Sequence, residues 1–243
     1  MGTDWQDHRL KELLDRETRW LGLQLAGDQI AALLSFGQEL ERQNRRFNLT
    51  AISEPPAVIR KHFADSLAPV PYLPTGIRKL VDIGSGAGFP GLVLKICCPD
   101  LDITLVESIK KKAAFLTQTA AFLGLDGVNV IERRAEQLGH ETQYREQFDV
   151  ATARAVAPLP ALLELCLPLL SVGGCFIAYK GPQVDEEIRT SARALSLLGG
   201  TIEAVKKLTL LGDEKRTLVF VRKIAPTPPQ YPRGPGRPAK RPL

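Results

Sequence analysis

Three glycines follow a short apolar run at a spacing that lets a ligand approach the main chain. The segment Lys79–Leu94 reads KLVDIGSGAGFPGLVL and contains Gly86, Gly88 and Gly91 in the pattern G-x-G-x-x-G. Glycine adopts positive φ at little cost and has no Cβ to hold a ligand away. The pattern alone does not identify the ligand. It predicts a cofactor-binding turn between a strand and a helix.

A carboxylate beside this turn bears on the charge of the cofactor. Asp82 precedes Gly84 by two residues, at the predicted end of the strand. The pyrophosphate of a dinucleotide, which has to meet the helix N-terminus there, would be repelled. The same carboxylate attracts the cationic amino-acid part of a sulfonium cofactor, and Phe89 and Pro90 add an apolar wall and a preset φ. We therefore expect S-adenosylmethionine in this turn.

Two further positions at strand ends suit an adenosine. Glu107 ends the next predicted strand, about twenty residues after the glycines, where a carboxylate accepts hydrogen bonds from ribose hydroxyls. Ala135 and Glu136 follow the third predicted strand, at the rim where an adenine ring would lie. Together with Asp82 and Gly84, these residues outline a site that runs from the methionine end of the cofactor to its adenine.

Strands that alternate with helices must position these residues. Five apolar segments predict strands, at 79–84, 102–107, 128–133, 148–154 and 174–181, with helical segments between them. Such an order requires a parallel sheet with right-handed crossovers. The segments 201–211 and 216–223 are joined by only four residues, so they predict an antiparallel hairpin. We expect an α/β, Rossmann-like fold of the class I S-adenosylmethionine-dependent methyltransferases, with a mainly parallel seven-stranded sheet that ends in this hairpin.

Three regions divide the chain. Residues 1–74 predict a helical extension or lid, with apolar stripes that begin at Leu10 and Ile30, and with Asp28 and Ser53 as candidate helix caps. Residues 75–224 predict the cofactor-binding core. Residues 225–243 contain many prolines, four cations and no acid, so we expect a basic tail that is extended or disordered when free.

Composition favours a cytoplasmic protein. No apolar run reaches the roughly 18 to 20 residues that cross a bilayer, and the N-terminus has no apolar signal segment. The four cysteines form no C-x-x-C pair, and with three histidines they predict neither a disulfide framework nor a metal site. The formal net charge is +5, and four of the cations lie in the tail. This asymmetry favours an anionic partner for the tail, such as nucleic acid, although charge that only aids solubility explains it nearly as well.

Several motifs along the chain together resemble one family. The sequence is similar to the GidB/RsmG family of bacterial methyltransferases, which use S-adenosylmethionine to modify N7 of a guanine in small-subunit (16S) ribosomal RNA. The motifs that carry the resemblance are NRRFNLTAI (44–52), RKHFADSL (60–67), VDIGSGAGFPG (81–91), TLVES (104–108), RAE (134–136), ARA (153–155) and YKG (179–181).

The resemblance implies the residues of the cofactor site. Gly84, Phe89, Ala135, Glu136 and Arg154 match cofactor-contacting positions of the family. With the positions argued above, the expected cofactor-binding set is Asp82, Gly84, Ser85, Gly86, Gly88, Phe89, Glu107, Ser108, Ala135, Glu136 and Arg154.

Arg154, at the predicted end of the fourth strand, is the one residue expected to act in catalysis. It would position the cofactor and donate to guanine O6 or to a phosphate, with a salt bridge to a neighbouring acid as the alternative. Guanine N7 carries a lone pair and no proton, so direct in-line methyl transfer needs no general base. The rate would come mainly from positioning, for which roughly 7 to 11 kcal/mol is available.

The expected partner is ribosomal RNA or the small ribosomal subunit, bound by a monomer without a metal. Lys180 would bind a phosphate or be an ordinary surface lysine, and His62 would contact substrate or hydrogen-bond a neighbouring acid. The candidate substrate-binding residues are Asn48, His62, Asp65, Lys180 and, in the tail, Arg233, Arg237, Lys240 and Arg241.

Three other functions compete with this one. A methyltransferase of the same fold could act on a small molecule or a protein. A nicotinamide-dependent oxidoreductase would share the glycine pattern, but it conflicts with Asp82 and with the terminal hairpin. An RNA-binding protein without activity would have no use for the complete set of cofactor positions. The sequence leaves open which nucleotide is modified, and whether naked RNA or the assembled subunit is the substrate.

Overall fold

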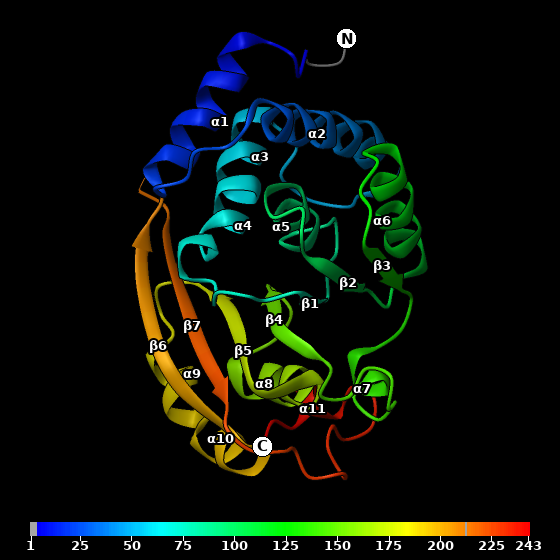
Figure 1. The fold of residues 1–243 in the computed structure, drawn as a ribbon, viewed down its shortest axis with the longest axis vertical. Coiled ribbons are helices and arrows are strands. Elements are labelled where there is room, and N and C mark those ends of the chain that lie inside the picture. The colour runs from blue at the N-terminus through cyan, green and yellow to red at the C-terminus, as the bar shows by residue number, and fades with distance from the viewer. Residues whose placement is uncertain (1–3, 212) are drawn as a thin grey trace.

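A seven-stranded sheet runs through the molecule (Figure 1). The computed structural model describes residues 4–211 and 213–243. The strand order is β3-β2-β1-β4-β5-β7-β6. In chain order the strands are β1 (Lys79–Ile83), β2 (Asp102–Val106), β3 (Val128–Ile131), β4 (Phe148–Arg154), β5 (Leu170–Lys180), β6 (Gly200–Thr209) and β7 (Lys215–Lys223).

The pairing pattern confirms the expected fold class. Strands β3, β2, β1, β4 and β5 pair in parallel with one another, whereas β7 pairs antiparallel with both β5 and β6. The carboxyl ends of β1, β2 and β4 therefore lie at one edge of the sheet, where their following loops meet. The antiparallel insertion brings the start of β7 next to the end of β5, with Lys180 opposite Thr217.

Both faces of the sheet are covered by helices, and side chains alternate between the two cores. Cys175, Ile177 and Tyr179 of β5 face one core, while Phe176 and Ala178 face the other. This period of two is the geometry of a strand that is buried on both faces. The α-helices that follow β1 in the chain are α5 (Gly91–Cys97), α6 (Lys110–Phe122), α7 (Ala135–Leu138), α8 (Leu159–Cys166), α9 (Asp185–Thr190), α10 (Ala192–Leu198) and α11 (Arg237–Lys240).

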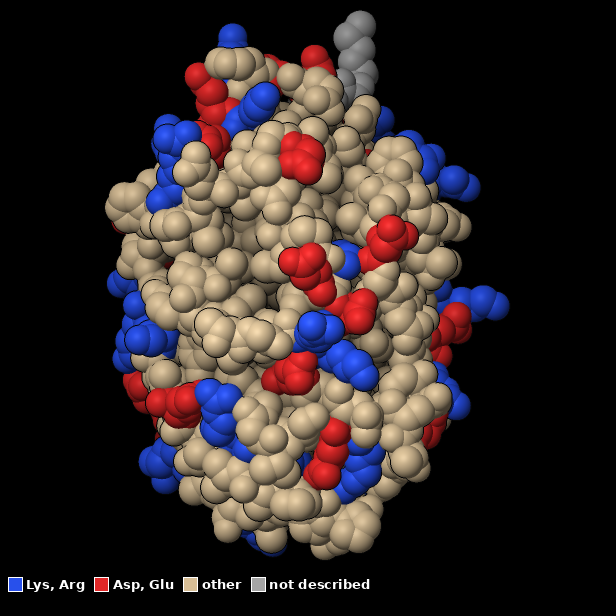
Figure 2. Space-filling view, viewed as in Figure 1, with Lys and Arg blue, Asp and Glu red and all other residues tan. Residues whose placement is uncertain are grey.

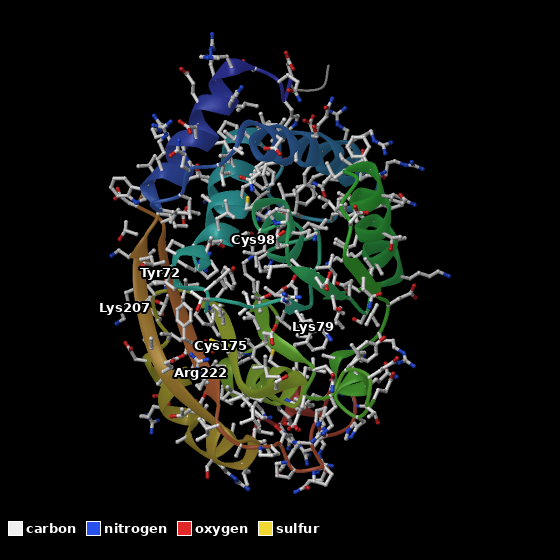
Figure 3. The ribbon with its side chains drawn as sticks, viewed as in Figure 1. Tyr72, Lys79, Cys98, Cys175, Lys207 and Arg222 are labelled. Carbon is white, nitrogen blue, oxygen red and sulfur yellow. The ribbon has the colours of Figure 1, made fainter. Side chains whose placement is uncertain are left out.

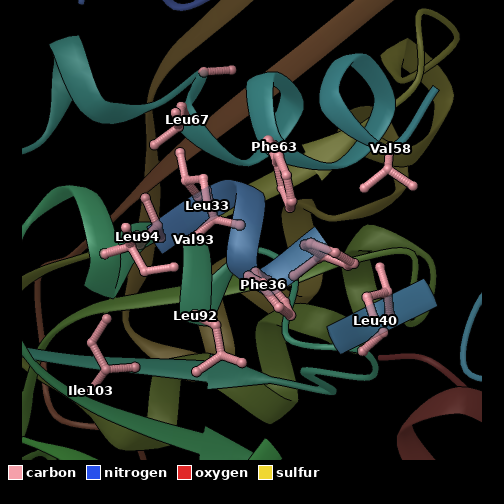
Figure 4. Packing of buried hydrophobic residues seen from close by; sticks show 14 of the residues in the cluster. Leu33, Phe36, Leu40, Val58, Phe63, Leu67, Leu92, Val93, Leu94 and Ile103 are labelled. Carbon is pink, nitrogen blue, oxygen red and sulfur yellow. The ribbon is translucent and has the colours of Figure 1, made fainter. Parts of the chain in front are cut away.

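The N-terminal helices complete the first of these cores. They are α1 (His8–Trp20), α2 (Gly27–Phe47), α3 (Pro55–Val58), a π-helical segment (Ile59–Ala64) and α4 (Asp65–Leu67). Figure 4 shows Leu33, Phe36 and Phe63 from this region packed against Leu92 of α5. Residues 4–74 are therefore part of the main core as well as a cover for the site.

Neither predicted cap of these helices is present. Helix α2 begins one residue before Asp28, which lies in the first turn instead of preceding it. Helix α3 follows Glu54 and has no side-chain cap, so Ser53 does not cap this helix.

The prediction of a disordered tail is wrong. Residues 225–243 include the short helix α11 and pack along α7 and α8 (Figure 1). Arg145 donates to four main-chain carbonyls, three of them in this segment, and Arg233 forms an ion pair with the fully buried Glu164. Side chains of the folded core thus satisfy the polar backbone of a segment that has no periodic apolar pattern. Proline content alone does not reveal such partners.

All four cysteines are free thiols. Cys98, which directly follows α5, lies apart from Cys175 of β5 (Figure 3). Burial raises the pKa of the Cys175 thiol to about 11, so it is not a reactive thiolate at neutral pH. Within residues 4–211 and 213–243, no helix is long and apolar enough to cross a lipid bilayer.

Candidate functional site

The turn after β1 has the backbone that its glycines predict. Gly84, Gly86 and Gly88 have φ values of +71°, +57° and +94°. The N–H of Gly84 donates to the carbonyl of Val106 at 2.8 Å, which fixes the turn against the end of β2. A Cβ on Gly84 would lie 2.5 Å from Cγ2 of Val156, so a side chain at this position would displace the loop after β4.

Asp82 lies beneath this turn and not at its surface. Its side chain is fully buried; Oδ1 accepts from the Thr152 hydroxyl at 2.8 Å, and Oδ2 accepts from the Gly91 N–H at 3.2 Å. Burial raises the pKa of this carboxyl to about 6, against these stabilising bonds. Asp82 therefore ties β1 to β4 and to α5. The carboxylate is fully buried instead of lying at the surface of the turn, and its contact with a cationic cofactor stays a prediction.

Glu107 is positioned at the end of β2 by main-chain donors. Its Oε2 accepts from the N–H of Gly86 at 3.0 Å, and its Oε1 accepts from the N–H of Ile109 at 2.8 Å. Each carboxylate oxygen has a further lone pair. The carboxylate is thus held in one orientation and can still accept from two neighbouring hydroxyls, as a ribose diol presents.

A cavity of about 190 Å³, here called the glycine-corner cavity, opens at this edge of the sheet. Oε1 of Glu136 lies on its wall and accepts from the N–H of Gly236, in the C-terminal segment, at 2.7 Å. The lining residues are Ile83, Gly84, Val106, Glu107, Ser108, Arg133, Arg134, Ala135, Glu136, Val156, Ala157, Leu165, Gly236 and Ala239.

A second cavity of about 490 Å³, here called the Arg154 cavity, lies on the other side of the loop after β4. Ala157 lines both cavities. The lining residues are Ile52, Lys61, His62, Asp65, Arg154, Ala155, Ala157, Tyr179, Lys180, Gly181, Glu187, Leu210, Glu214 and Arg216. Two ligands could therefore meet at residues 155–157.

Charged side chains in the Arg154 cavity are paired across elements. The buried Asp65 accepts from Nη1 of Arg154 at 2.7 Å and from Nη2 of Arg216 at 2.9 Å. Lys180 contacts Glu187 at 2.6 Å and donates to the carbonyl of Ala157 at 2.9 Å. These pairs hold the N-terminal helices, β4, β5 and β7 together around the cavity.

His62 is a neutral ring within this arrangement. Arg154 can only donate, so Nδ1 of His62 accepts from its Nη2 at 3.2 Å, and the ring proton is on Nε2, which donates to Oγ1 of Thr50 at 2.9 Å. The ring stacks on Phe89, with centroids 4.3 Å apart. Burial, together with the Arg154 charge, lowers the pKa of His62 to about 3.

The family model described as GidB, rRNA small subunit methyltransferase G, matches residues 29–219. The chain belongs to the GidB family.

Relatives in this family match along almost their whole lengths. Proteins named ribosomal RNA small subunit methyltransferase G are 47% identical in Roseiflexus castenholzii, over 96% of this chain and 100% of the relative, and 40% identical in Acetivibrio thermocellus, over 99% of each. The tail of this GidB-family protein therefore falls within the matched region.

Solved structures show the same fold at low identity. The YcgJ protein of Bacillus subtilis covers 68% of this chain and 100% of its own, with 14% identity and a TM-score of 0.51. The cyclase SpnF covers 68% of this chain and 82% of its own, with 17% identity and a TM-score of 0.51. A cyclase on this fold illustrates that the fold does not define the reaction.

In this GidB-family chain, the predicted site residues fall into two groups around the two cavities. Gly84, Glu107, Ser108, Ala135 and Glu136 line the glycine-corner cavity, and His62, Asp65, Arg154 and Lys180 line the Arg154 cavity.

Other predicted cofactor residues support the turn from behind. Ser85 is buried and donates to the Asp82 carbonyl at 3.0 Å. Gly86 and Gly88 shape the backbone, and Phe89 backs the His62 ring. Arg154 has the salt bridge that was the alternative to its expected cofactor and substrate contacts.

Two predicted substrate residues, Asn48 and Arg233, do not line the Arg154 cavity. Asn48 is the exposed left-handed residue that ends α2, and it is the side chain of Asn44, not that of Asn48, that holds the Thr50 backbone. Arg233 is held in its ion pair with Glu164 and is not a free cation. Arg237, Lys240 and Arg241 are exposed.

Sequence reasoning missed Arg216, Glu187 and the cavity contact of Gly236. Arg216 reaches Asp65 only because β7 runs antiparallel beside β5. The one available signal was the predicted hairpin, which brings the start of its second strand to the end of the fifth. No pattern in the sequence links Gly236 to Glu136.

Proposed function

We propose that this protein transfers a methyl group from S-adenosylmethionine to N7 of a guanine in small-subunit ribosomal RNA. Membership of the GidB family supports ribosomal RNA as the substrate class. The observation that carries the finer proposal is the pair of cavities that share Ala157, one with an adenosine-type carboxylate and the other lined by cations and the carboxylates paired with them.

The glycine-corner cavity fits the cofactor in its chemistry. Glu107 has one acceptor position on each oxygen for a ribose diol, and Gly84 leaves the backbone uncovered for close approach. When bound, S-adenosylmethionine supplies an electrophilic methyl group. Ala135 and Glu136 would contact the adenine, and Ser108 would lie beside the ribose. Asp82 acts indirectly, by holding β1, β4 and α5 in place below the site.

The Arg154 cavity suits a base that needs no deprotonation. His62 has a pKa of about 3 and both ring nitrogens occupied, and the carboxylates of Asp65, Glu187 and Glu214 are all paired with cations. None of these side chains is poised as a general base. Guanine N7 has a free lone pair, so direct in-line transfer requires only that the protein position the base and exclude water.

Substrate binding would use the cations at the cavity and beyond it. Lys180, with the exposed Arg237, Lys240 and Arg241, would contact phosphates. On the face in Figure 2, Lys and Arg side chains are intermixed with Asp and Glu, so no broad basic surface covers this face. We therefore propose that the RNA is recognised by its shape and by a few phosphate contacts. We also propose that the protein acts in the cytoplasm and as a monomer.

The test is methyl transfer to defined RNA. Small-subunit RNA or whole subunits from a strain that lacks this gene are incubated with tritium-labelled cofactor, and the labelled base is mapped. We expect label at one guanine, and no transfer when that guanine is replaced by 7-deazaguanine, which lacks the N7 lone pair. Label on an exocyclic nitrogen, on a protein or on a small molecule would contradict the proposal.

A further inference from the structure

The C-terminal segment after β7 is fastened to the core along its length. The N–H and the guanidinium of Arg233 both donate to the buried Glu164, at distances between 2.6 and 2.8 Å for the closest contacts. Arg145 donates to the carbonyls of Thr227 at 2.6 Å and Tyr231 at 2.8 Å. Because Arg233 neutralises this buried carboxylate, we expect the folded protein to keep the segment in place.

Beyond these anchors the segment reaches the glycine-corner cavity. Gly236 and Ala239 line that cavity, and the N–H of Gly236 binds Oε1 of Glu136 at 2.7 Å. Gly236 has φ +76°, a conformation that L-residues with a Cβ rarely adopt, and a Cβ there would meet no protein atom within 4 Å. The segment therefore presents a backbone turn to open space on the cavity wall.

The chemistry of this wall suits a flat heteroaromatic ring. Ala135, Leu165 and Ala239 are small or apolar, whereas Glu136 adds a carboxylate at the edge. The ribose-type acceptor Glu107 lines the same cavity. An adenine joined to a ribose at Glu107 would extend toward α7 and the C-terminal segment.

We propose that residues 226–243 are part of the cofactor site, where they close the adenine end of the glycine-corner cavity, so that tight cofactor binding requires this segment. The proposal rests on the assignment of this cavity to S-adenosylmethionine. It gives the tail a role in the donor site, in addition to the phosphate contacts proposed for its exposed cations.

The first experiment measures cofactor affinity by calorimetry for two bulky substitutions in the C-terminal segment. Ala239→Phe introduces a ring at the cavity wall, whereas Pro242→Phe introduces the same ring three residues later, at an exposed position that does not line the cavity. We expect Ala239→Phe to raise the dissociation constant of S-adenosylmethionine about tenfold or more, and Pro242→Phe to leave it within about twofold. Equal effects of the two substitutions would overturn the proposal.

The second experiment removes the wall and keeps its anchor. A chain that ends at Arg233 retains the ion pair with Glu164 and lacks Gly236 and Ala239. We expect its affinities for S-adenosylmethionine and S-adenosylhomocysteine to be lowered by about the same factor, because both compounds contain the adenosine. Unchanged affinity for both compounds would overturn the proposal.

Glu107→Ala separates failure of this proposal from failure of the site assignment. If Glu107→Ala weakens cofactor binding and the C-terminal variants do not, the segment has no role and the cavity assignment stands. If Glu107→Ala also leaves affinity unchanged, both proposals fall. In the full chain, bound cofactor should slow hydrogen exchange of the amides in residues 234–240, since coupling between ligand and segment is reciprocal.

Discussion

Asp65 and Arg154 form an ion pair across the boundary between the N-terminal helices and the sheet, with 2.7 Å between Oδ2 and Nη1. Asp65 begins α4 and Arg154 ends β4, and the same carboxylate also binds Arg216 at the start of β7. One buried acid thus joins three regions of the chain at the Arg154 cavity.

Substitution of Asp65 by Asn should therefore be costly. It leaves two largely buried guanidinium groups without their counter-charge, and we expect a loss of about 3 kcal/mol or more in the free energy of unfolding. The measurement is urea denaturation. Glu214→Gln is the control, since it breaks the half-exposed pair with Lys61 and should cost less than about 1 kcal/mol. Similar losses in the two variants would show that the Asp65 pairs contribute little.

The lowered pKa of His62 should make the stability of the folded protein depend on pH. Its pKa is about 3 in the folded protein and about 6.5 in the unfolded chain, so only the unfolded state takes up this proton between those values. The contribution is fully present above pH 6.5 and is lost as the pH falls toward 3. Between pH 7.5 and pH 5, the wild type should lose about 2 kcal/mol more than His62→Gln. Denaturation curves at the two pH values test this, and parallel losses would mean that the ring is protonated in the folded state.

Arg233→Ala should destabilise the fold and release the C-terminal segment. It leaves the fully buried carboxylate of Glu164 without its counter-charge, so we expect a loss of about 3 to 5 kcal/mol in the free energy of unfolding. Arg189→Ala, which breaks an exposed pair with Glu186, should have a far smaller effect on the free energy of unfolding. The double variant Glu164→Leu and Arg233→Met should recover most of the loss, because no charge remains buried. Failure of the double variant to recover stability would point to the lost backbone contacts instead.

Two glycines with similar positive φ values allow backbone strain to be distinguished from an effect on the cofactor site. Gly84 and Gly76 have φ values of +71° and +77°, but only a Cβ on Gly84 would meet Val156, at 2.5 Å. Alanine at either position should cost about 1 kcal/mol from the positive φ. Only Gly84→Ala should weaken S-adenosylmethionine binding, because Val156 lines the glycine-corner cavity and has to move. Calorimetry with both variants decides this, and equal affinities would mean that the loop yields without affecting the site.

The sequence by itself determined the order of strands and helices, the closing hairpin, the glycine turn and the place of Glu107 at the end of β2. These features are local, since they depend on runs of apolar residues, on glycine at positive φ and on the number of residues between segments. The hairpin also implied a mainly parallel sheet that changes direction at its edge.

Tertiary structure alone decided the partners of the charged residues. Asp82, which follows the pattern of a surface carboxylate at a strand end, is covered because α5 and β4 pack over it. Arg154 pairs with a residue 89 positions earlier, and the tail is ordered by carbonyl contacts with Arg145 and by Glu164. Such contacts join residues far apart in the chain, and the burial that makes each of them strong arises only when the layers pack together.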